Sequence, residues 1–137
     1  MEQEERKEVK FVVSKSKKIL IVEDDKLMRD LYQEILVKEG YEVATAEDGL
    51  EGEEMMKKGG YDLVLLDIML PEKDGLQILD DLSDKERARC GKIVVLTSLG
   101  QDALVENGFE LGADGYLFKS ALNPDQVLEE VKGYLGD

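Results

Sequence analysis

Three short runs of apolar residues, each ending in polar side chains, restrict most strongly what this chain can fold into. They are "KILIVE" (18–23), "YDLVLLD" (61–67) and "KIVVLTS" (92–98). Consecutive Val, Ile and Leu residues over such a length are typical of a β-strand that is covered on both faces. Strands of this kind belong to parallel sheets with helices on each side, so the runs predict the centre of an α/β fold.

The segments between these runs complete a regular alternation of strands and helices. Shorter strands are predicted at 41–46 and 114–119, and helices at 25–40, 50–59, 75–82, 101–112 and 123–135. Leu27, Leu31 and Ile35 recur at helical spacing, and Asn123 followed by Pro124 is typical of the start of a helix. Strict alternation of five strands and five helices predicts a doubly wound, five-stranded parallel sheet with right-handed crossovers.

Length and charge limit the organisation of the chain and its partners. The 137 residues suffice for one domain, which we expect over 17–137 after a charged N-terminal extension or linker at 1–16. A formal net charge of −14 argues against a broad basic face for direct nucleic-acid binding. No apolar run approaches the roughly 20 residues of a membrane span, so we expect no membrane contact.

The chain contains no histidine and only one cysteine, Cys90. Without histidine it has neither a Ser-His-Asp nor a Cys-His catalytic site, and no histidine-ligated zinc. We therefore expect Cys90 to be a small apolar residue rather than a nucleophile, and a reducing, cytoplasmic location fits best. Any phosphohistidine in the chemistry of this chain must lie on another protein.

Polar side chains follow four of the five predicted strands at their carboxyl ends. Glu23 and Asp24 follow the first strand, Asp67 the third, Thr97 the fourth and Lys119 the fifth. In a doubly wound sheet these ends lie along one edge, where ligands bind. Carboxylates in one cleft disfavour each other's ionisation, which a dication such as Mg²⁺ relieves. We expect Mg²⁺ there; the alternative is that these acids only begin loops or cap helices.

The motifs at these strand ends resemble those of the receiver domains of two-component response regulators. The matching segments are "ILIVEDD" (19–25), "DLVLLDIMLPEKDG" (62–75), "VVLTS" (94–98) and "GADGYLFK" (112–119). The resemblance extends from about Lys17 to Leu135 and implies the (βα)5 flavodoxin-like fold of a single-domain, chemotaxis-regulator-like receiver. It implies a phosphoacceptor switch in a phosphorelay, with a sensor histidine kinase or a phosphotransfer protein as donor.

The resemblance also assigns roles to the residues at the strand ends. Asp67 is implied to be the phosphoacceptor and Lys119 its counter-charge. The implied Mg²⁺ ligands are Asp24 directly, Glu23 through water, Asp67, and the backbone carbonyl of Met69. Phosphoryl transfer to Asp67 would be self-catalysed, so the protein is not expected to be a dedicated enzyme.

Thr97 and Tyr116 are implied to form the switch that carries the signal outwards. The Thr97 hydroxyl would contact the phosphoryl group, and the Tyr116 ring would rotate in response, changing a partner-binding face built from the fourth helix, the fifth strand and the fifth helix. The alternative for Tyr116 is an edge-strand aromatic residue that only packs. The partner is expected to be a protein, with the chain a monomer or weak dimer.

Two positions depart from the family pattern. The family usually has proline after the lysine of the fifth strand, often in a cis peptide, whereas this chain has Ser120. A cis bond before serine would cost about 2.5–4 kcal/mol, which puts the reach of Lys119 in question. Met69 and Leu99 stand two residues beyond Asp67 and Thr97, where neither side chain can orient a water molecule well, so we expect slow autodephosphorylation.

Three alternative functions would use a sheet of this kind, and the sequence argues against two of them. A haloacid-dehalogenase-like phosphohydrolase needs an aspartate two residues after its nucleophile, but Lys26 follows Asp24 at that spacing. A flavodoxin-like carrier needs a hydroxyl-rich phosphate loop after the first strand, where this chain has acids. A receiver-fold interaction module that is never phosphorylated stays open, because of Ser120. We expect a stand-alone receiver, although residues 1–16 are also compatible with the end of a longer parent.

Overall fold

The computed structural model describes residues 16–98, 101–119 and 123–137, so most of the predicted extension at 1–16 lies outside the described residues. Five parallel strands form one sheet in the order β2-β1-β3-β4-β5. The strands are β1 (Lys18–Val22), β2 (Glu42–Ala46), β3 (Leu63–Asp67), β4 (Lys92–Thr97) and β5 (Gly115–Phe118). This order confirms the predicted doubly wound sheet, and the winding direction reverses beside β1, which pairs with both β2 and β3.

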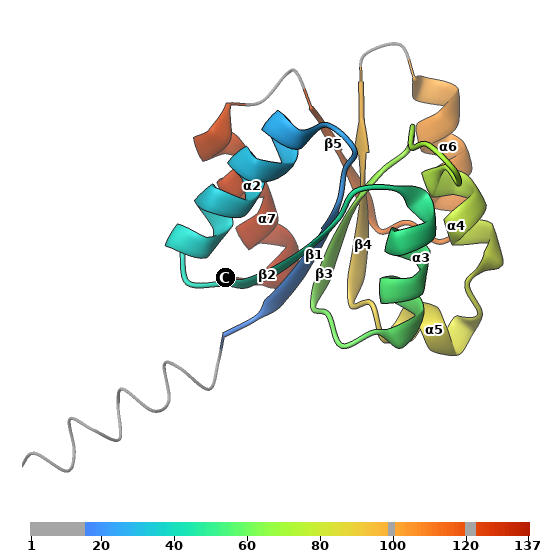
Figure 1. The fold of residues 1–137 in the computed structure, drawn as a ribbon, viewed down its shortest axis with the longest axis horizontal. Coiled ribbons are helices and arrows are strands. Elements are labelled where there is room, and N and C mark those ends of the chain that lie inside the picture. Colours follow the sequence, from blue (N-terminus) through green and yellow to red (C-terminus); the bar gives the residue numbers. More distant parts are fainter. Residues whose placement is uncertain (1–15, 99–100, 120–122) are drawn as a thin grey trace, which may run out of the picture.

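Among the described residues, six helices cover the two faces of the sheet. They are α2 (Lys26–Lys38), α3 (Gly49–Lys58), α4 (Gly75–Asp81), α5 (Asp84–Ala88), α6 (Asp102–Glu110) and α7 (Pro124–Leu135). Helices α2 and α7 lie on one face, and α3, α4, α5 and α6 lie on the other (Figure 1). The sequence predicted five of them, and α5 is the addition.

The short helix α5 has a local cause that the apolar pattern does not show. The Ser83 hydroxyl accepts a hydrogen bond from the Glu86 N–H at 3.1 Å, and the Glu86 carboxylate accepts one from the Ser83 N–H at 2.9 Å. This capping box stabilises a single helical turn without burying an apolar stripe. Helical periodicity cannot be detected in a helix of 5 residues.

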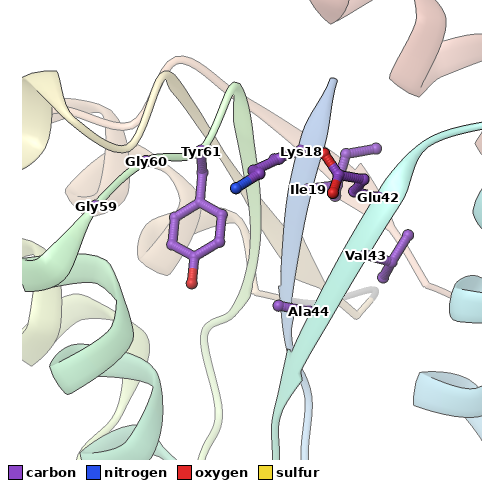
Figure 2. Close-up of a pocket in the computed structure, with 8 residues that line it drawn as sticks. All are labelled: Lys18, Ile19, Glu42, Val43, Ala44, Gly59, Gly60 and Tyr61. Carbon is purple, nitrogen blue, oxygen red and sulfur yellow. The ribbon is translucent and has the colours of Figure 1, made fainter. Parts of the chain in front are cut away.

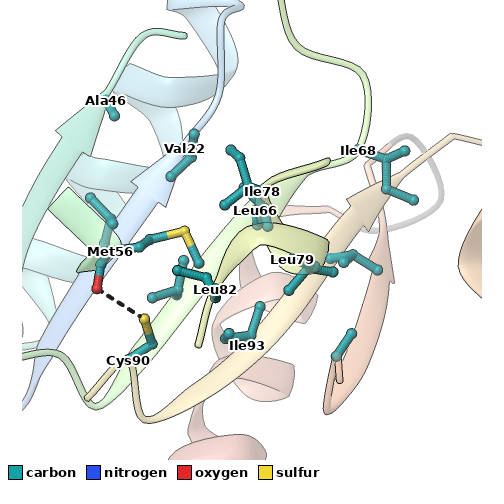
Figure 3. Close-up of a cluster of buried hydrophobic side chains, with 14 of the residues drawn as sticks. Val22, Ala46, Met56, Leu66, Ile68, Ile78, Leu79, Leu82, Cys90 and Ile93 are labelled. Carbon is teal, nitrogen blue, oxygen red and sulfur yellow. Dashed lines mark hydrogen bonds between the residues drawn. The ribbon is translucent and has the colours of Figure 1, made fainter. Parts of the chain in front are cut away.

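The sheet separates two apolar layers that share the central strands. Residues of β1, β3 and β4 alternate between the layers, so that every residue from Ile19 to Val22 and from Leu63 to Leu66 is fully buried. The layer beneath α3, α4 and α6 includes Met56, Ile78 and Ile93 (Figure 3). Burial of both faces explains why these strands are continuous apolar runs.

Cys90 lies within this layer and packs there as a small apolar residue. Its side chain is fully buried, and its thiol lies 3.4 Å from the carbonyl oxygen of Met56 (Figure 3). Burial raises the pKa of the Cys90 thiol to about 11.

In the described parts of the chain, no helix is both long enough and apolar enough to span a bilayer.

Helix α2 buries a different face from the one that the leucine spacing emphasises. The Asp25 carboxylate accepts hydrogen bonds from the first-turn N–H groups, so Asp25 is the N-cap. Tyr32 and Leu36 are buried, whereas Leu27 is 82% exposed and Leu31 is 39% exposed. An apolar ridge on α2 therefore faces outward beside the carboxyl end of β1.

Candidate functional site

The side chains at the carboxyl ends of β1, β3 and β5 meet in one cleft. The Lys119 ammonium donates a hydrogen bond to Asp67 Oδ2 at 2.8 Å and lies 2.9 Å from Glu23 Oε1. Glu23 is fully buried and Asp67 is 3% exposed, whereas the Lys119 side chain keeps 20% of its surface exposed. Two buried carboxylates therefore share one partly exposed ammonium group.

The third acid, Asp24, completes a set of oxygen ligands. One carboxylate oxygen from each of Glu23, Asp24 and Asp67 lies within 4.8 Å of the other two. The buried Glu23 Oε1 is 2.9 Å from the Lys119 ammonium, an ion pair without good hydrogen-bond geometry. One ammonium group balances the charge of only one carboxylate, so three converging acids stay costly unless a further cation completes their environment. The three acids therefore fit a hard divalent cation such as Mg²⁺.

The electrostatics of the cleft show how tightly these groups depend on one another. Burial is the main cause that raises the pKa of Glu23, and the neighbouring Asp67 adds to it against the opposing contacts of Lys119. Burial alone would lower the pKa of Lys119, but its contacts with Asp67 and Glu23 outweigh this and raise it. Lys119 is thus held as a cation, while burial and the neighbouring carboxylate disfavour the charged form of Glu23.

Arg29 on α2 fixes the backbone of the acidic pair, and the sequence did not predict this role. Its guanidinium donates to the carbonyl oxygen of Glu23 at 2.8 Å and to that of Asp24 at 3.3 Å, and it pairs with Glu47 at 3.2 Å. The residue is only 7% exposed. An arginine on an amphipathic helix ordinarily faces solvent, so its position in the sequence gave no signal.

The loop after Asp67 is held by a close approach of two backbones. Gly75 begins α4, and a Cβ atom there would lie 2.5 Å from the Asp67 carbonyl oxygen. Asp74 caps α4 in a capping box. The Met69 N–H donates to Asp67 Oδ1 at 3.1 Å, so the Asp67 carboxylate is held from two sides.

Lys73, a residue for which the sequence predicted no role, joins the same loop to helices α3 and α4. Its ammonium forms ion pairs with Glu53 on α3, at 2.6 Å, and with Asp81 on α4. These contacts raise the pKa of Lys73, led by the hydrogen bond with Asp81. The loop that follows the central carboxylate is therefore anchored to two helices.

Thr97 and Tyr116 lie where the sequence predicted, at the end of β4 and on β5. Thr97 is 1% exposed, and its hydroxyl donates to Gln101 Oε1 at 2.7 Å. The Tyr116 ring is 40% exposed and packs edge-to-face against Phe109, at 6.1 Å between centroids, and Phe118, at 5.3 Å. Tyr116 is thus part of an exposed aromatic cluster, with Thr97 in the interior.

One depression in the described surface lies away from this cleft. It has a volume of about 300 Å³ and is lined at the amino ends of β1 and β2 by residues such as Lys18, Glu42 and Tyr61 (Figure 2). Its lining lacks the convergent acids of the opposite sheet edge. The chemistry of the side chains, rather than the size of a cavity, therefore identifies the candidate site.

Comparison with known families agrees with the fold and the cleft. A model of the response regulator receiver domain matches residues 19–132, which include every acid of the site. The chain belongs to this family. As a receiver domain it has its acids, lysine and threonine at the carboxyl edge of the sheet, where a doubly wound fold binds its ligands.

Individual relatives of this receiver domain are regulators and receiver domains. The chain is 37% identical over 120 residues to the transcriptional regulatory protein SrrA of Staphylococcus aureus. This match covers 88% of the chain and 48% of SrrA. It thus spans about half the length of that relative. A receiver domain from Methanospirillum hungatei is 33% identical to this chain with a TM-score of 0.79, and the match covers 88% of this chain and 94% of that domain. The chemotaxis response regulator CheY4 of Vibrio cholerae is 27% identical with a TM-score of 0.78, and the match covers 88% of this chain and 99% of CheY4.

Some predictions for this receiver domain concern positions that the described residues do not include. Ser120 and Leu99 lie outside them, so the conformation of the Lys119–Ser120 peptide and the role of Leu99 stay predictions. The Met69 side chain is 58% exposed. The use of its backbone carbonyl as a metal ligand also stays a prediction.

Proposed function

We propose that this receiver domain is a phosphoacceptor switch in which Asp67 takes a phosphoryl group from a phosphohistidine of a sensor histidine kinase or phosphotransfer protein. The observation that carries the proposal is the Asp67 carboxylate, 3% exposed and hydrogen-bonded to the Lys119 ammonium at 2.8 Å, beside two further acids. A purely structural ion pair would need one acid for one lysine, whereas this cleft concentrates three.

Mg²⁺ is the proposed cofactor, held by Asp24, Asp67 and the Met69 carbonyl, with Glu23 acting through water. When bound, it supplies charge neutralisation for the acids and for a phosphoryl oxygen. The convergence of three carboxylates beside the Lys119 ammonium supports this assignment, because one ammonium balances only one of their charges. Arg29 holds the backbone of the acidic pair, so the ligand positions are set before a cation arrives.

The transfer step is an in-line displacement at phosphorus. A carboxylate oxygen of Asp67 forms the new O–P bond, the bond from phosphorus to the donor breaks, and its electron pair leaves with the donor's imidazole. The Met69 N–H and the Lys119 ammonium hold the two carboxylate oxygens and so restrict the rotation of the attacking group. Lys119 then neutralises charge on a phosphoryl oxygen, and the Thr97 hydroxyl can donate to another.

Two exposed surfaces suit the two partners that such a switch needs. Leu27 and Leu31 on α2 form an outward apolar ridge beside the acidic cleft, and we propose that the phosphodonor docks there. The aromatic cluster of Phe109, Tyr116 and Phe118 lies on α6 and β5, part of the face proposed for the downstream protein, and Phe109 and Tyr116 are its exposed members. Phosphorylation would change that face through Thr97 and Tyr116.

We further propose that the phosphoryl transfer takes place in the cytoplasm, and that Asp67 loses its phosphoryl group by slow autodephosphorylation rather than by dedicated enzymatic turnover.

The test is Mg²⁺-dependent phosphorylation by acetyl phosphate, followed by intact mass. We expect wild type to gain the mass of one phosphoryl group, and we expect no gain in EDTA or in Asp67→Asn. Lys119→Met should be phosphorylated far more slowly, whereas the matched change Lys58→Met, on the 77%-exposed side of an ion pair on α3, should leave the rate unchanged. A wild type that binds Mg²⁺ but never gains mass would instead identify an interaction module that keeps the receiver fold.

A further inference from the structure

The hydroxyl of Thr97 is already engaged in the unphosphorylated protein. Gln101 Oε1 lies 2.7 Å from Thr97 Oγ1 and 2.8 Å from the Ser98 backbone nitrogen. Thr97 sits one residue beyond Leu96, which pairs with Asp67 across β3 and β4. The group expected to contact a phosphoryl oxygen therefore has a competing partner within the same chain.

The direction of these two hydrogen bonds follows from their chemistry. A backbone N–H can only donate, so the side-chain atom of Gln101 that faces Ser98 must be the amide oxygen. That oxygen cannot donate, so the Thr97 hydroxyl must direct its single proton to it. While this bond exists, the proton is not available to a phosphoryl group on Asp67. The carbonyl of Ser98, at 3.3 Å, is a more distant alternative acceptor.

Gln101 is also the N-cap residue directly before α6, which links the Thr97 hydroxyl to the start of that helix. At the corresponding N-cap positions of α2, α4 and α7, the side chains of Asp25, Asp74 and Asn123 bind first-turn N–H groups of their own helices. Gln101 makes no such bond among the described residues; its side chain reaches back to the end of β4. A turn of the Thr97 hydroxyl towards Asp67 therefore removes a contact that joins β4 to the start of α6.

We propose that Gln101 is a positioning residue that holds the Thr97 hydroxyl away from Asp67 in the unphosphorylated protein and passes its release to the amino end of α6. This inference rests on the proposed function and names the element that receives the signal first. Phosphorylation exchanges the neutral Thr97–Gln101 bond for a charge-assisted bond from Thr97 to a phosphoryl oxygen. Loss of the Gln101 acceptor removes the competitor and favours the phosphorylated conformation.

The experiment measures the affinity for beryllofluoride, a phosphoryl mimic, in the presence of Mg²⁺ by ¹⁹F NMR or calorimetry. Gln101→Met keeps the length of the side chain but removes the acceptor, and we expect it to bind beryllofluoride about three- to tenfold more tightly than wild type, the equivalent of one hydrogen bond. In a Thr97→Val background the same change should have no effect, because there is no hydroxyl to release.

Gln126→Met is the matched control. Gln126 Oε1 also accepts a backbone N–H, that of Asn123 at 2.8 Å, but it lies on α7 and has no bond to Thr97. This variant should bind beryllofluoride as wild type does. A second readout needs no ligand: Gln101→Met should speed hydrogen exchange of the Ser98 amide, whereas Gln126→Met should not.

Each outcome decides between the proposals. Equal affinities of Gln101→Met and wild type, or an effect that persists in Thr97→Val, would overturn the role of Gln101 while leaving the phosphoacceptor intact. Unchanged Ser98 exchange in Gln101→Met would show that the bond is not formed in solution, and would overturn it as well. A wild type that does not bind beryllofluoride with Mg²⁺ would overturn the proposed function, and the role of Gln101 with it.

Discussion

Substitution of Gly75 by alanine tests whether the close approach of α4 to β3 positions Asp67. The Cβ of alanine would lie 2.5 Å from the Asp67 carbonyl oxygen and 3.1 Å from the Cα of Ile68. Contacts of a Cβ atom essentially never fall below 3.0 Å, so one backbone must move by about half an ångström. Both neighbouring atoms belong to the main chain, and the Gly75 N–H is bonded to the Ile68 carbonyl at 2.9 Å, so neither can yield freely.

The expected cost follows from this overlap. Overpacking of this kind destabilises a protein by about 1–3 kcal/mol. Alanine recovers part of that cost through its helix propensity, up to about 1 kcal/mol relative to glycine. Because the 2.5 Å overlap is with a main-chain atom, we expect the upper part of this range, about 2–3 kcal/mol, before that recovery. Gly75→Ala should therefore lower the free energy of unfolding by about 1–2 kcal/mol, and slow phosphorylation by acetyl phosphate because the displaced backbone carries Asp67.

Gly133→Ala is the matched control, since Gly133 is an exposed residue of α7 and its Cβ would have no described atom within 4 Å. Alanine should stabilise the protein there by about 0.5–1 kcal/mol. Urea denaturation followed by far-UV circular dichroism gives both free energies at a common m value. The reasoning is refuted if Gly75→Ala is as stable as wild type while Gly133→Ala behaves as expected.

Three further predictions concern the core and the acidic cleft. Arg29→Met should lower the free energy of unfolding by about 1–3 kcal/mol because it leaves the buried Glu23 carbonyl without its donor. The control Lys26→Met removes a side chain that is 77% exposed in its ion pair with Asp30, and should change the free energy of unfolding by less than about 0.5 kcal/mol. Equal effects of the two substitutions in urea titrations would contradict this. With its pKa raised to about 11, Cys90 has about one thousandth of its thiol ionised at pH 8, so Ellman's reagent should react only after unfolding; fast reaction of the native protein would show an accessible thiol. The pKa of Glu23 is raised in the folded state, so protonated Glu23 contributes stability below its unfolded pKa of 4.5, and this stability is lost as the pH rises through the folded-state pKa. In EDTA, Glu23→Gln should therefore be more stable than wild type at pH 7, and the difference in unfolding free energy should close below pH 4.5. A difference that does not change with pH would refute this assignment.

The strands and the main site residues could be predicted from sequence because their causes are local or topological. A strand buried on both faces must be apolar throughout, as Ile19 to Val22 shows. Parallel strands place their carboxyl ends on one edge, so the approach of Glu23, Asp67 and Lys119 followed from their positions after predicted strands.

The remaining features depend on contacts that no spacing encodes. Arg29 is buried because tertiary structure brings two carbonyl oxygens to its guanidinium, although its residue type favours solvent. Gln101 stands where a sequence pattern places an ordinary helix start, and only its side-chain rotamer directs it to Thr97. Leu27 faces outward because α2 carries a second apolar row, Met28, Tyr32 and Leu36, and that row packs on the sheet.

Location of the phosphoryl group within the phosphorylated chain tests the central claim most directly. Borohydride reduces an acyl phosphate of aspartate to homoserine, so peptide mass spectrometry of the reduced protein identifies the acceptor. We predict conversion at Asp67 alone, dependent on Mg²⁺, and strongly reduced in Lys119→Met. Conversion at another acid of the cleft, such as Asp24, or at Asp67 to the same extent in EDTA, would contradict the account.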